Sequence, residues 1–253
     1  MLSPDGYCWA CGTKQVWLSA KIINDELAGA WEINRTIREA FDARESMFCP
    51  NCGASCRSRS LSEAICRLYH NTNSLENLVT TPGFQKLRVA EINSCGTIHR
   101  LFSRLPYLSY SEYNSTDPAI RSEDLHNLSY SDSTFDLVFS SDTLEHVPNL
   151  ARALSEIYRI LKPGGRHVFT IPVVWNRQTR TRAVLQGTII NHLETPSYHG
   201  NGGPDYLVFT EFGGDAPKFF MRSGFEVRLF GINLRNLEDP SGVFVATRMG
   251  EVP

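Results

Sequence analysis

From about residue 85 onward, the sequence alternates short apolar runs with stretches of helical periodicity. Such alternation is typical of βαβ units, which build a mostly parallel sheet with helices on both faces. In one helical stretch Leu154, Ile157, Tyr158 and Leu161 recur at helical spacing, and the PGG at 163–165 then ends the helix. The expected strands are LRVAEIN (87–93), LSYSEY (108–113), FDLVFSS (135–141), RHVFTIP (166–172), FEVRLFG (225–231) and GVFVATR (242–248).

Composition excludes several classes of protein. Of the 253 residues 42% are hydrophobic and 21% are charged, which is enough apolar material for a sizeable core. The net charge of -2 gives no attraction toward polyanions, so nucleic acid is not an expected partner. The sequence contains no run of about eighteen apolar residues, so it predicts no membrane-spanning helix. The first residues lack the basic stretch followed by an apolar one that is typical of a signal peptide. We therefore expect a cytoplasmic protein without a membrane partner.

Four of the seven cysteines form two C-x-x-C pairs, CWAC at 8–11 and CPNC at 49–52. Two such pairs supply the four thiolates that tetrahedral Zn²⁺ prefers, and a glycine after the second pair permits the tight turn. Buried free thiols or a redox pair are the alternatives. We predict a structural zinc, because four protein ligands leave no position for a substrate. The expected ligands are Cys8, Cys11, Cys49 and Cys52.

The block at 123–172 contains an acidic-Leu turn, the strand FDLVFSS, the segment LEHV and the turn LKPGG, in that order. It resembles the class I S-adenosylmethionine-dependent methyltransferases of the type 11 group. The resemblance implies a doubly wound, mostly parallel seven-stranded sheet with a Rossmann-like arrangement and a ligand at the carboxyl ends of its strands. Residues 1–70 are expected to form a small zinc-ribbon-like module, and 71–253 the methyltransferase domain.

The same resemblance implies a site for S-adenosylmethionine. Where the family has an acidic residue and a glycine-rich turn, this chain has Glu91 followed by NSCG, and asparagine tolerates the left-handed backbone better than most residues. A carboxylate after the second strand would accept hydrogen bonds from both ribose hydroxyls. The matching positions are Glu91, Asn93 and Gly96 in the first loop, Glu112 for the ribose, Asp124 and Leu125 for the adenine, and Ser140, Ser141 and Asp142 beneath the methionine. His146 either lines the same pocket or makes a structural contact.

The segment 173–212 is longer than an ordinary connection and is the expected substrate-binding insert. Methyl transfer to a hydroxyl requires a base to accept its proton, and the candidates are His199, His192 and Glu211. His199 is preferred, because it lies in a glycine-rich stretch and its ordinary pKa suits the task. Three arginines, Arg177, Arg180 and Arg182, could clamp an anionic acceptor or form a solvated turn.

Three hypotheses follow. The first is an O-methyltransferase of a sugar, glycan or other small hydroxylated or anionic metabolite, in which the zinc module shapes the substrate side or an oligomer interface. The second is a non-catalytic scaffold protein that recruits a partner through the zinc module. The third is transfer to nitrogen or carbon, since the cofactor pocket is common to all these chemistries. A homo-oligomer is left open.

Overall fold

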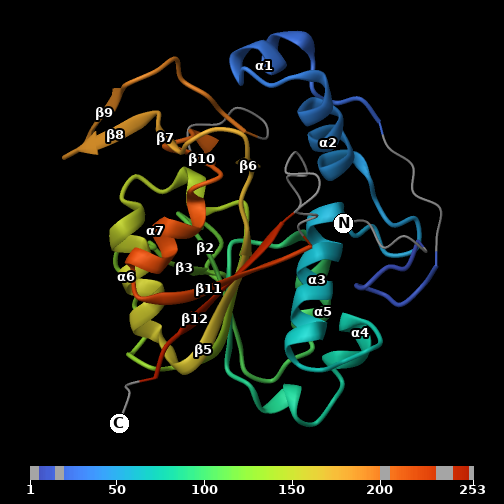
Figure 1. Cartoon of the computed structure of the whole chain (residues 1–253). Helices are drawn as coiled ribbons and strands as arrows, with labels where there is room; N and C mark the ends of the chain where they lie inside the picture. Colours follow the sequence, from blue (N-terminus) through green and yellow to red (C-terminus); the bar gives the residue numbers. More distant parts are fainter. Residues whose placement is uncertain (1–5, 15–19, 200–205, 232–241, 251–253) are drawn as a thin grey trace.

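The structure is a computed structural model that describes residues 6–14, 20–199, 206–231 and 242–250. Its centre is a seven-stranded sheet in which β12 alone runs against the other strands (Figure 1). This is the doubly wound arrangement expected from the sequence, and all six expected strands are present. In spatial order the strands are β11 (Phe225–Phe230), β12 (Val243–Arg248), β5 (Leu161–Thr170), β4 (Phe135–Ser141), β1 (Val89–Ile92), β2 (Leu108–Glu112) and β3 (Arg121–Ser122).

Helices cover both faces of the sheet, and a separate apolar cluster fills each interface (Figure 1). Strands β1 and β4 are buried on both faces, which explains their continuous apolar sequences. On one face lie α3 (Cys56–Leu68), α4 (Leu75–Leu78) and α5 (His99–Phe102), and on the other α6 (Leu150–Ile160) and α7 (Ala216–Arg222). Single helical turns are η1 (Phe84–Lys86), η2 (Gly96–Ile98) and η3 (Leu144–His146).

Helix α6 shows how the local sequence sets element boundaries. The Asn149 side chain accepts a hydrogen bond from the backbone N–H of Arg152 and so caps the first turn. The helix ends at Ile160, and β5 then starts with a bulged turn. A side chain at Gly165 would lie 2.8 Å from a backbone carbonyl oxygen, and Gly164 has a φ of +78°. The two glycines of the LKPGG turn are therefore required by geometry.

The N-terminal region is joined to the sheet through helix α3. Two short helices precede it, α1 (Asp25–Ala30) and α2 (Arg35–Ser46), each capped by an asparagine side chain. Ile37 and Phe41 of α2 pack with Val174 of the insert. The cysteines of the two pairs share a core cluster with α3 and with strand residues such as Phe139. The division of the chain at residue 70 remains a prediction.

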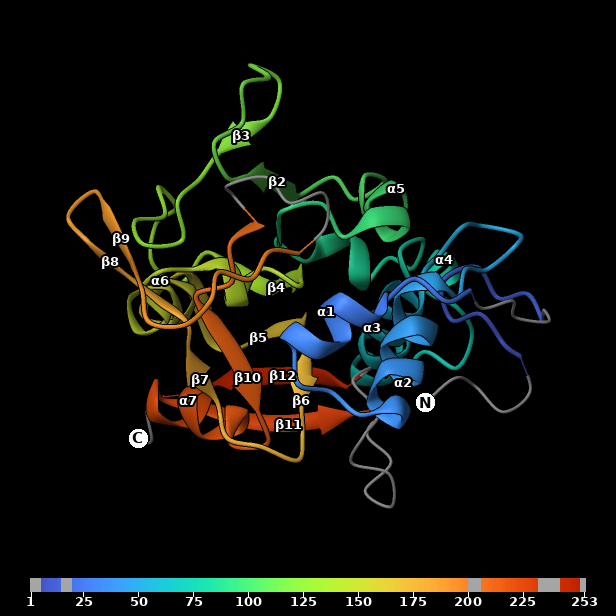
Figure 2. The same ribbon diagram turned by 90° about the horizontal axis from the view of Figure 1, so that it is seen from above.

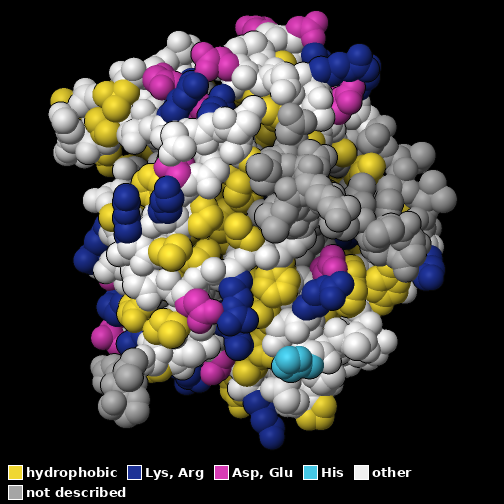
Figure 3. Space-filling view, in the orientation of Figure 1, with side chains coloured by type: hydrophobic (Ala, Val, Ile, Leu, Met, Phe, Trp, Pro, Cys, Tyr) yellow, Lys and Arg dark blue, Asp and Glu magenta, His cyan; other side chains and the backbone are white. Residues whose placement is uncertain are grey.

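The insert at 173–212 forms two small sheets at the carboxyl end of the parallel strands. One has the order β6-β10-β7 and the other is the hairpin β8–β9. Figure 1 and Figure 2 show α1 beside the insert strands at this end of the sheet. Figure 3 shows apolar side chains over the hairpin, where Ile189 is 65% exposed. The strands are β6 (Val173–Val174), β7 (Arg180–Thr181), β8 (Ala183–Gln186), β9 (Ile189–His192) and β10 (Thr210–Gly213).

No helix among the described residues has the length and apolar character needed to cross a membrane.

Candidate functional site

The four cysteines of the two C-x-x-C pairs meet at one point, although 37 residues separate the pairs. The Sγ atoms of Cys8 and Cys52 lie 3.8 Å apart, and so do those of Cys11 and Cys49. A tetrahedral zinc with Zn–S bonds of about 2.3 Å requires sulfurs about 3.8 Å apart. The glycines that follow each pair, Gly12 and Gly53, have positive φ. The donor set and its spacing fit a structural zinc.

The loop after β1 takes the left-handed backbone that the sequence suggested. Asn93 has a φ of +55° and Gly96 a φ of +64°. The buried carboxylate of Glu91 accepts hydrogen bonds from the backbone N–H of Cys95 at 2.9 Å and from the imidazole of His99 at 2.6 Å. Burial raises the pKa of Glu91. This carboxylate therefore holds the loop from the inside, and Asn93 takes the left-handed backbone conformation that asparagine tolerates.

Glu112 ends β2 beside that loop. Its carboxylate accepts a hydrogen bond from the backbone N–H of Ser94 at 2.9 Å and one from the hydroxyl of Tyr110. Asp124 is half exposed and contacts His126 at 2.7 Å, while Leu125 is buried beneath it. All these positions follow neighbouring parallel strands, so they lie at one edge of the sheet. Their assignment to the ribose and the adenine remains a prediction.

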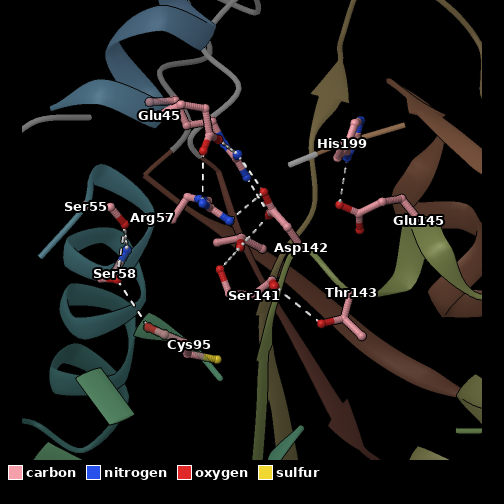
Figure 4. A network of polar contacts seen from close by, with 12 residues as sticks. Glu45, Ser55, Arg57, Ser58, Cys95, Ser141, Asp142, Thr143, Glu145 and His199 are labelled. Carbon is pink, nitrogen blue, oxygen red and sulfur yellow. Dashed lines mark hydrogen bonds and ion pairs between the residues drawn. The ribbon is translucent and has the colours of Figure 1, made fainter. Parts of the chain in front are cut away.

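The third group of expected cofactor residues ends β4. The hydroxyls of Ser140 and Ser141 contact His167 and Thr170, each at 3.0 Å. Asp142, with a φ of +48°, is held by two arginines of the N-terminal region (Figure 4). Arg44 donates to both carboxylate oxygens, at 2.6 and 2.7 Å, and Arg57 donates at 3.1 Å.

This ion-pair network was not anticipated from the sequence. Burial opposes ionisation of Asp142, but Arg44 and Arg57 outweigh it and hold the pKa of that carboxyl well below its usual range. The side chain of Arg44 is only 1% exposed. Both arginines belong to helices α2 and α3, and nothing in their helical spacing marks them as partners of a residue about 90 positions away. The N-terminal region therefore supplies charge to the predicted cofactor edge.

A small pocket, partly open to solvent, lies between the N-terminal region and the insert. Trp31 forms part of its wall and donates from its indole N–H to the hydroxyl of Ser197 at 3.2 Å. The backbone carbonyl of Trp31 accepts a hydrogen bond from Arg177 at 2.7 Å. The lining residues are Trp31, Phe41, Pro172, Val174, Arg177, Ser197, His199, Val208, Thr210 and Glu211.

Of the three candidate bases, His199 has the surroundings that suit the role. It lines the pocket, its ring centroid lies 5.5 Å from that of Trp31 and 5.2 Å from that of His146, and the glycine-rich stretch after it lies outside the described residues. Glu211 also lines the pocket but forms ion pairs with Arg177 at 2.7 Å and Arg182 at 2.9 Å. His192 is exposed on β9 and does not line the pocket.

Glu145 is the residue of this site that sequence reasoning missed. Its side chain is completely buried, and one carboxylate oxygen lies 3.7 Å from a ring nitrogen of His146 and 3.7 Å from one of His199 (Figure 4). No hydrogen bond reaches the carboxylate from the described residues. The sequence signal for it is the Glu-His pair in LEHV, in which His146 alone was a candidate site residue.

The three arginines of the insert are paired with carboxylates. Arg180 contacts Glu32 at 2.8 Å, and Arg182 contacts Glu194 at 3.2 Å as well as Glu211. Burial lowers the pKa of Arg177, which the nearby Glu211 partly offsets. The Arg180–Glu32 pair joins the insert to the N-terminal region, whereas the pairs of Arg177 and Arg182 lie within the insert. All three arginines have carboxylate partners, so they do not form the freely solvated turn that was the alternative to an anion clamp.

Comparison with known proteins gives a family match to one part of the chain. Residues 105–169 match the family described as a methyltransferase domain. This segment contains β2, β3, β4 and α6 and nearly all of β5. The matched segment lies within the seven-stranded sheet, which has the Rossmann-like fold of the S-adenosylmethionine-dependent methyltransferases. The resemblance drawn from the sequence is confirmed.

Individual relatives are similar over limited lengths. The demethylmenaquinone methyltransferase of Lactiplantibacillus plantarum is 30% identical over 116 residues, which cover 44% of this chain and 49% of that protein. The ubiquinone/menaquinone biosynthesis C-methyltransferase UbiE of Hydrogenovibrio crunogenus is 59% identical over 39 residues, 15% of each chain. This chain thus spans less than half the length of these curated relatives. A solved S-adenosylmethionine-dependent methyltransferase of Mesorhizobium loti is 18% identical, with a TM-score of 0.43 over 69% of this chain and 95% of that one.

Proposed function

We propose that the protein transfers a methyl group from S-adenosylmethionine to a hydroxyl of a small metabolite, with a sugar as the favoured class. The observation that carries the proposal is the pocket that Trp31 and His199 line, which lies at the same end of the sheet as the predicted cofactor residues. Aromatic side chains offer a flat apolar surface, and the polar groups opposite it suit a hydroxylated ligand.

The cofactor would bind at the carboxyl ends of the parallel strands. Glu112 offers two acceptor oxygens for the ribose diol, and the backbone of the Asn93–Gly96 loop allows close approach, while Asp124 and Leu125 would border the adenine. The residues present therefore fit S-adenosylmethionine, whose sulfonium supplies an electrophilic methyl group. The zinc would stabilise the N-terminal region and has no part in the chemistry.

The residues around the acceptor would orient its hydroxyl group and accept the hydroxyl proton. Bound S-adenosylmethionine would supply the electrophilic methyl group, and the residues that line the pocket would orient the acceptor oxygen toward it. A base must accept the hydroxyl proton. In the cluster of Glu145, His146 and His199, it is His199 that lines the pocket, and the buried Glu145 lies 3.7 Å from its ring. His199 is the favoured base because it lines the pocket.

Nitrogen or carbon acceptors form the second candidate. The names of similar proteins include N- and C-methyltransferases, such as the phosphoethanolamine N-methyltransferase 2 of Caenorhabditis elegans, which is 43% identical over 42 residues. The imidazole of His199 in the pocket, with the buried carboxylate of Glu145 near it, favours a hydroxyl, because an amine acceptor with a free lone pair needs less help from a base.

The test is isothermal titration of the zinc-loaded protein with S-adenosylmethionine and S-adenosylhomocysteine, followed by a screen of sugar, phenol and amine acceptors with methyl-labelled cofactor. Micromolar cofactor binding and label on a sugar oxygen are expected. Binding without turnover on any hydroxyl acceptor would exclude the O-transfer proposal, and no binding at millimolar cofactor would favour the non-catalytic scaffold.

A further inference from the structure

Glu145, His146 and His199 bring a carboxylate and two imidazoles to one point. One donor atom from each lies within 4.8 Å of the other two. Glu145 and His146 come from η3, directly after β4, whereas His199 comes from the far end of the insert. The fold therefore assembles this group from segments more than fifty residues apart, next to the acceptor pocket.

The carboxylate of Glu145 points to a missing ligand. Its side chain is fully buried, and neither oxygen receives a hydrogen bond from any residue that the structure describes. Burying a carboxylate without a partner is strongly unfavourable, so folded chains rarely keep one unless something neutralises it. Both imidazoles stand 3.7 Å away, beyond hydrogen-bond distance but close to the spacing of two ligands on one cation.

The surroundings of the histidines fit metal ligation. The Nδ1 of His146 lies 3.0 Å from the backbone carbonyl of Leu207, which fixes the N–H there and turns the lone pair of Nε2 toward Glu145. Metal-bound histidines commonly donate their second ring nitrogen to a carbonyl in this way. The ring of His199 is held by Trp31, and its backbone N–H donates to the carbonyl of Tyr206 at 3.0 Å.

We propose that Glu145, His146 and His199 form a second metal site, for a divalent first-row transition cation, separate from the four-cysteine zinc. Two imidazoles and one carboxylate suit such cations better than Mg²⁺ or Ca²⁺, which prefer oxygen ligands. Bonds of about 2.0–2.2 Å would place neighbouring donor atoms about 3.4 Å apart, so the 3.7 Å separations need to close by only a few tenths of an ångström.

Three protein ligands leave coordination positions open toward the pocket. If the proposed methyl transfer to a hydroxyl is correct, the acceptor oxygen would occupy one of them and release its proton to water more readily. His199 would then act as a ligand in the loaded protein and not as a free base. The binding proposal itself does not depend on the transfer reaction.

The experiment is a titration of the zinc-loaded protein with Co²⁺, followed by visible and near-ultraviolet absorption. We expect one Co²⁺ per chain with d–d bands and without the thiolate charge-transfer absorption that cobalt at the cysteines would produce. Glu145→Gln and His199→Gln should each weaken Co²⁺ binding at least tenfold. His70→Gln, which changes an exposed histidine outside the cluster, should leave it unchanged.

Zinc content and circular dichroism of each variant check that the fold is retained, and the second variant keeps the test valid should one fail to fold. Absence of cobalt binding at millimolar concentration, or equal binding by wild type and a folded Glu145→Gln, would overturn the site. Titration of the same samples with S-adenosylmethionine separates the two proposals. Cofactor binding without cobalt binding rejects only the metal site, and cobalt binding without cofactor binding rejects only the methyltransferase function.

Discussion

Replacing Arg44 by methionine should destabilise the protein strongly, because it leaves the buried Asp142 carboxylate without its main partner. The side chain of Arg44 is 1% exposed and that of Asp142 13% exposed, so solvent cannot replace the lost contacts. Breaking a buried ion pair on one side costs about 3–5 kcal/mol. Arg57 still reaches Asp142 at 3.1 Å, which places the expected loss at the lower end, about 3 kcal/mol.

Urea denaturation of the zinc-loaded protein, followed by circular dichroism, measures this loss. With a slope of about 3 kcal/mol per M urea, the midpoint of Arg44→Met should fall by about 1 M. Arg35→Met is the matched control on the same helix, since Arg35 forms an ion pair with Glu39 in which the two side chains are 90% and 57% exposed. Its midpoint should not move measurably.

A double-mutant cycle isolates the pair. Arg44→Met combined with Asp142→Asn should be less destabilised than the sum of the single variants, with a coupling energy of about 2 kcal/mol. The pKa of Asp142 lies below the ordinary aspartate value of about 3.9. Its ionised form therefore stabilises the fold above about pH 4 and is lost as the pH falls further. If Arg44→Met and Arg35→Met have equal midpoints, or the cycle shows additivity, the proposed link between the N-terminal region and β4 is refuted.

Three further predictions concern other parts of the molecule. Burial lowers the pKa of His167 to about 3, so between about pH 6.5 and pH 3 only the unfolded chain binds a proton at this residue. The free energy of unfolding should therefore fall with acidification by up to about 1.4 kcal/mol per pH unit. Urea midpoints measured across this pH range should depend less on pH in His167→Gln than in the wild type. Cys49→Ser should reduce the zinc measured by elemental analysis well below one per chain, whereas Cys66→Ala, at a cysteine outside the cluster, should retain it. Glu112→Gln should weaken cofactor binding in calorimetry about tenfold, roughly 1.4 kcal/mol, and an unchanged affinity would remove Glu112 from the ribose site.

Much of the fold could be predicted from the sequence because it depends on local patterns. Buried parallel strands require continuous apolar runs, and FDLVFSS is such a run, so β4 was located to the residue. The two C-x-x-C pairs are local knuckles whose spacing alone indicates zinc ligands, and the structure brings them together. Asn93 could be assigned a left-handed backbone because its side chain tolerates that conformation, and its φ is +55°.

The contacts between the N-terminal region, β4 and the insert were decided only by the tertiary structure. Arg44 meets Asp142 across 98 positions of sequence, and His199 meets Glu145 across more than fifty. The periodicity of the sequence does not predict such pairs, because it indicates only which face of a helix or strand is apolar. From the sequence alone, charged residues within one predicted module are expected to be exposed to solvent. Only the packing of the folded chain removes the water around them. Burial, which converts a Glu-His dipeptide into a candidate metal site, is a property of the assembled chain and has no local sequence signal.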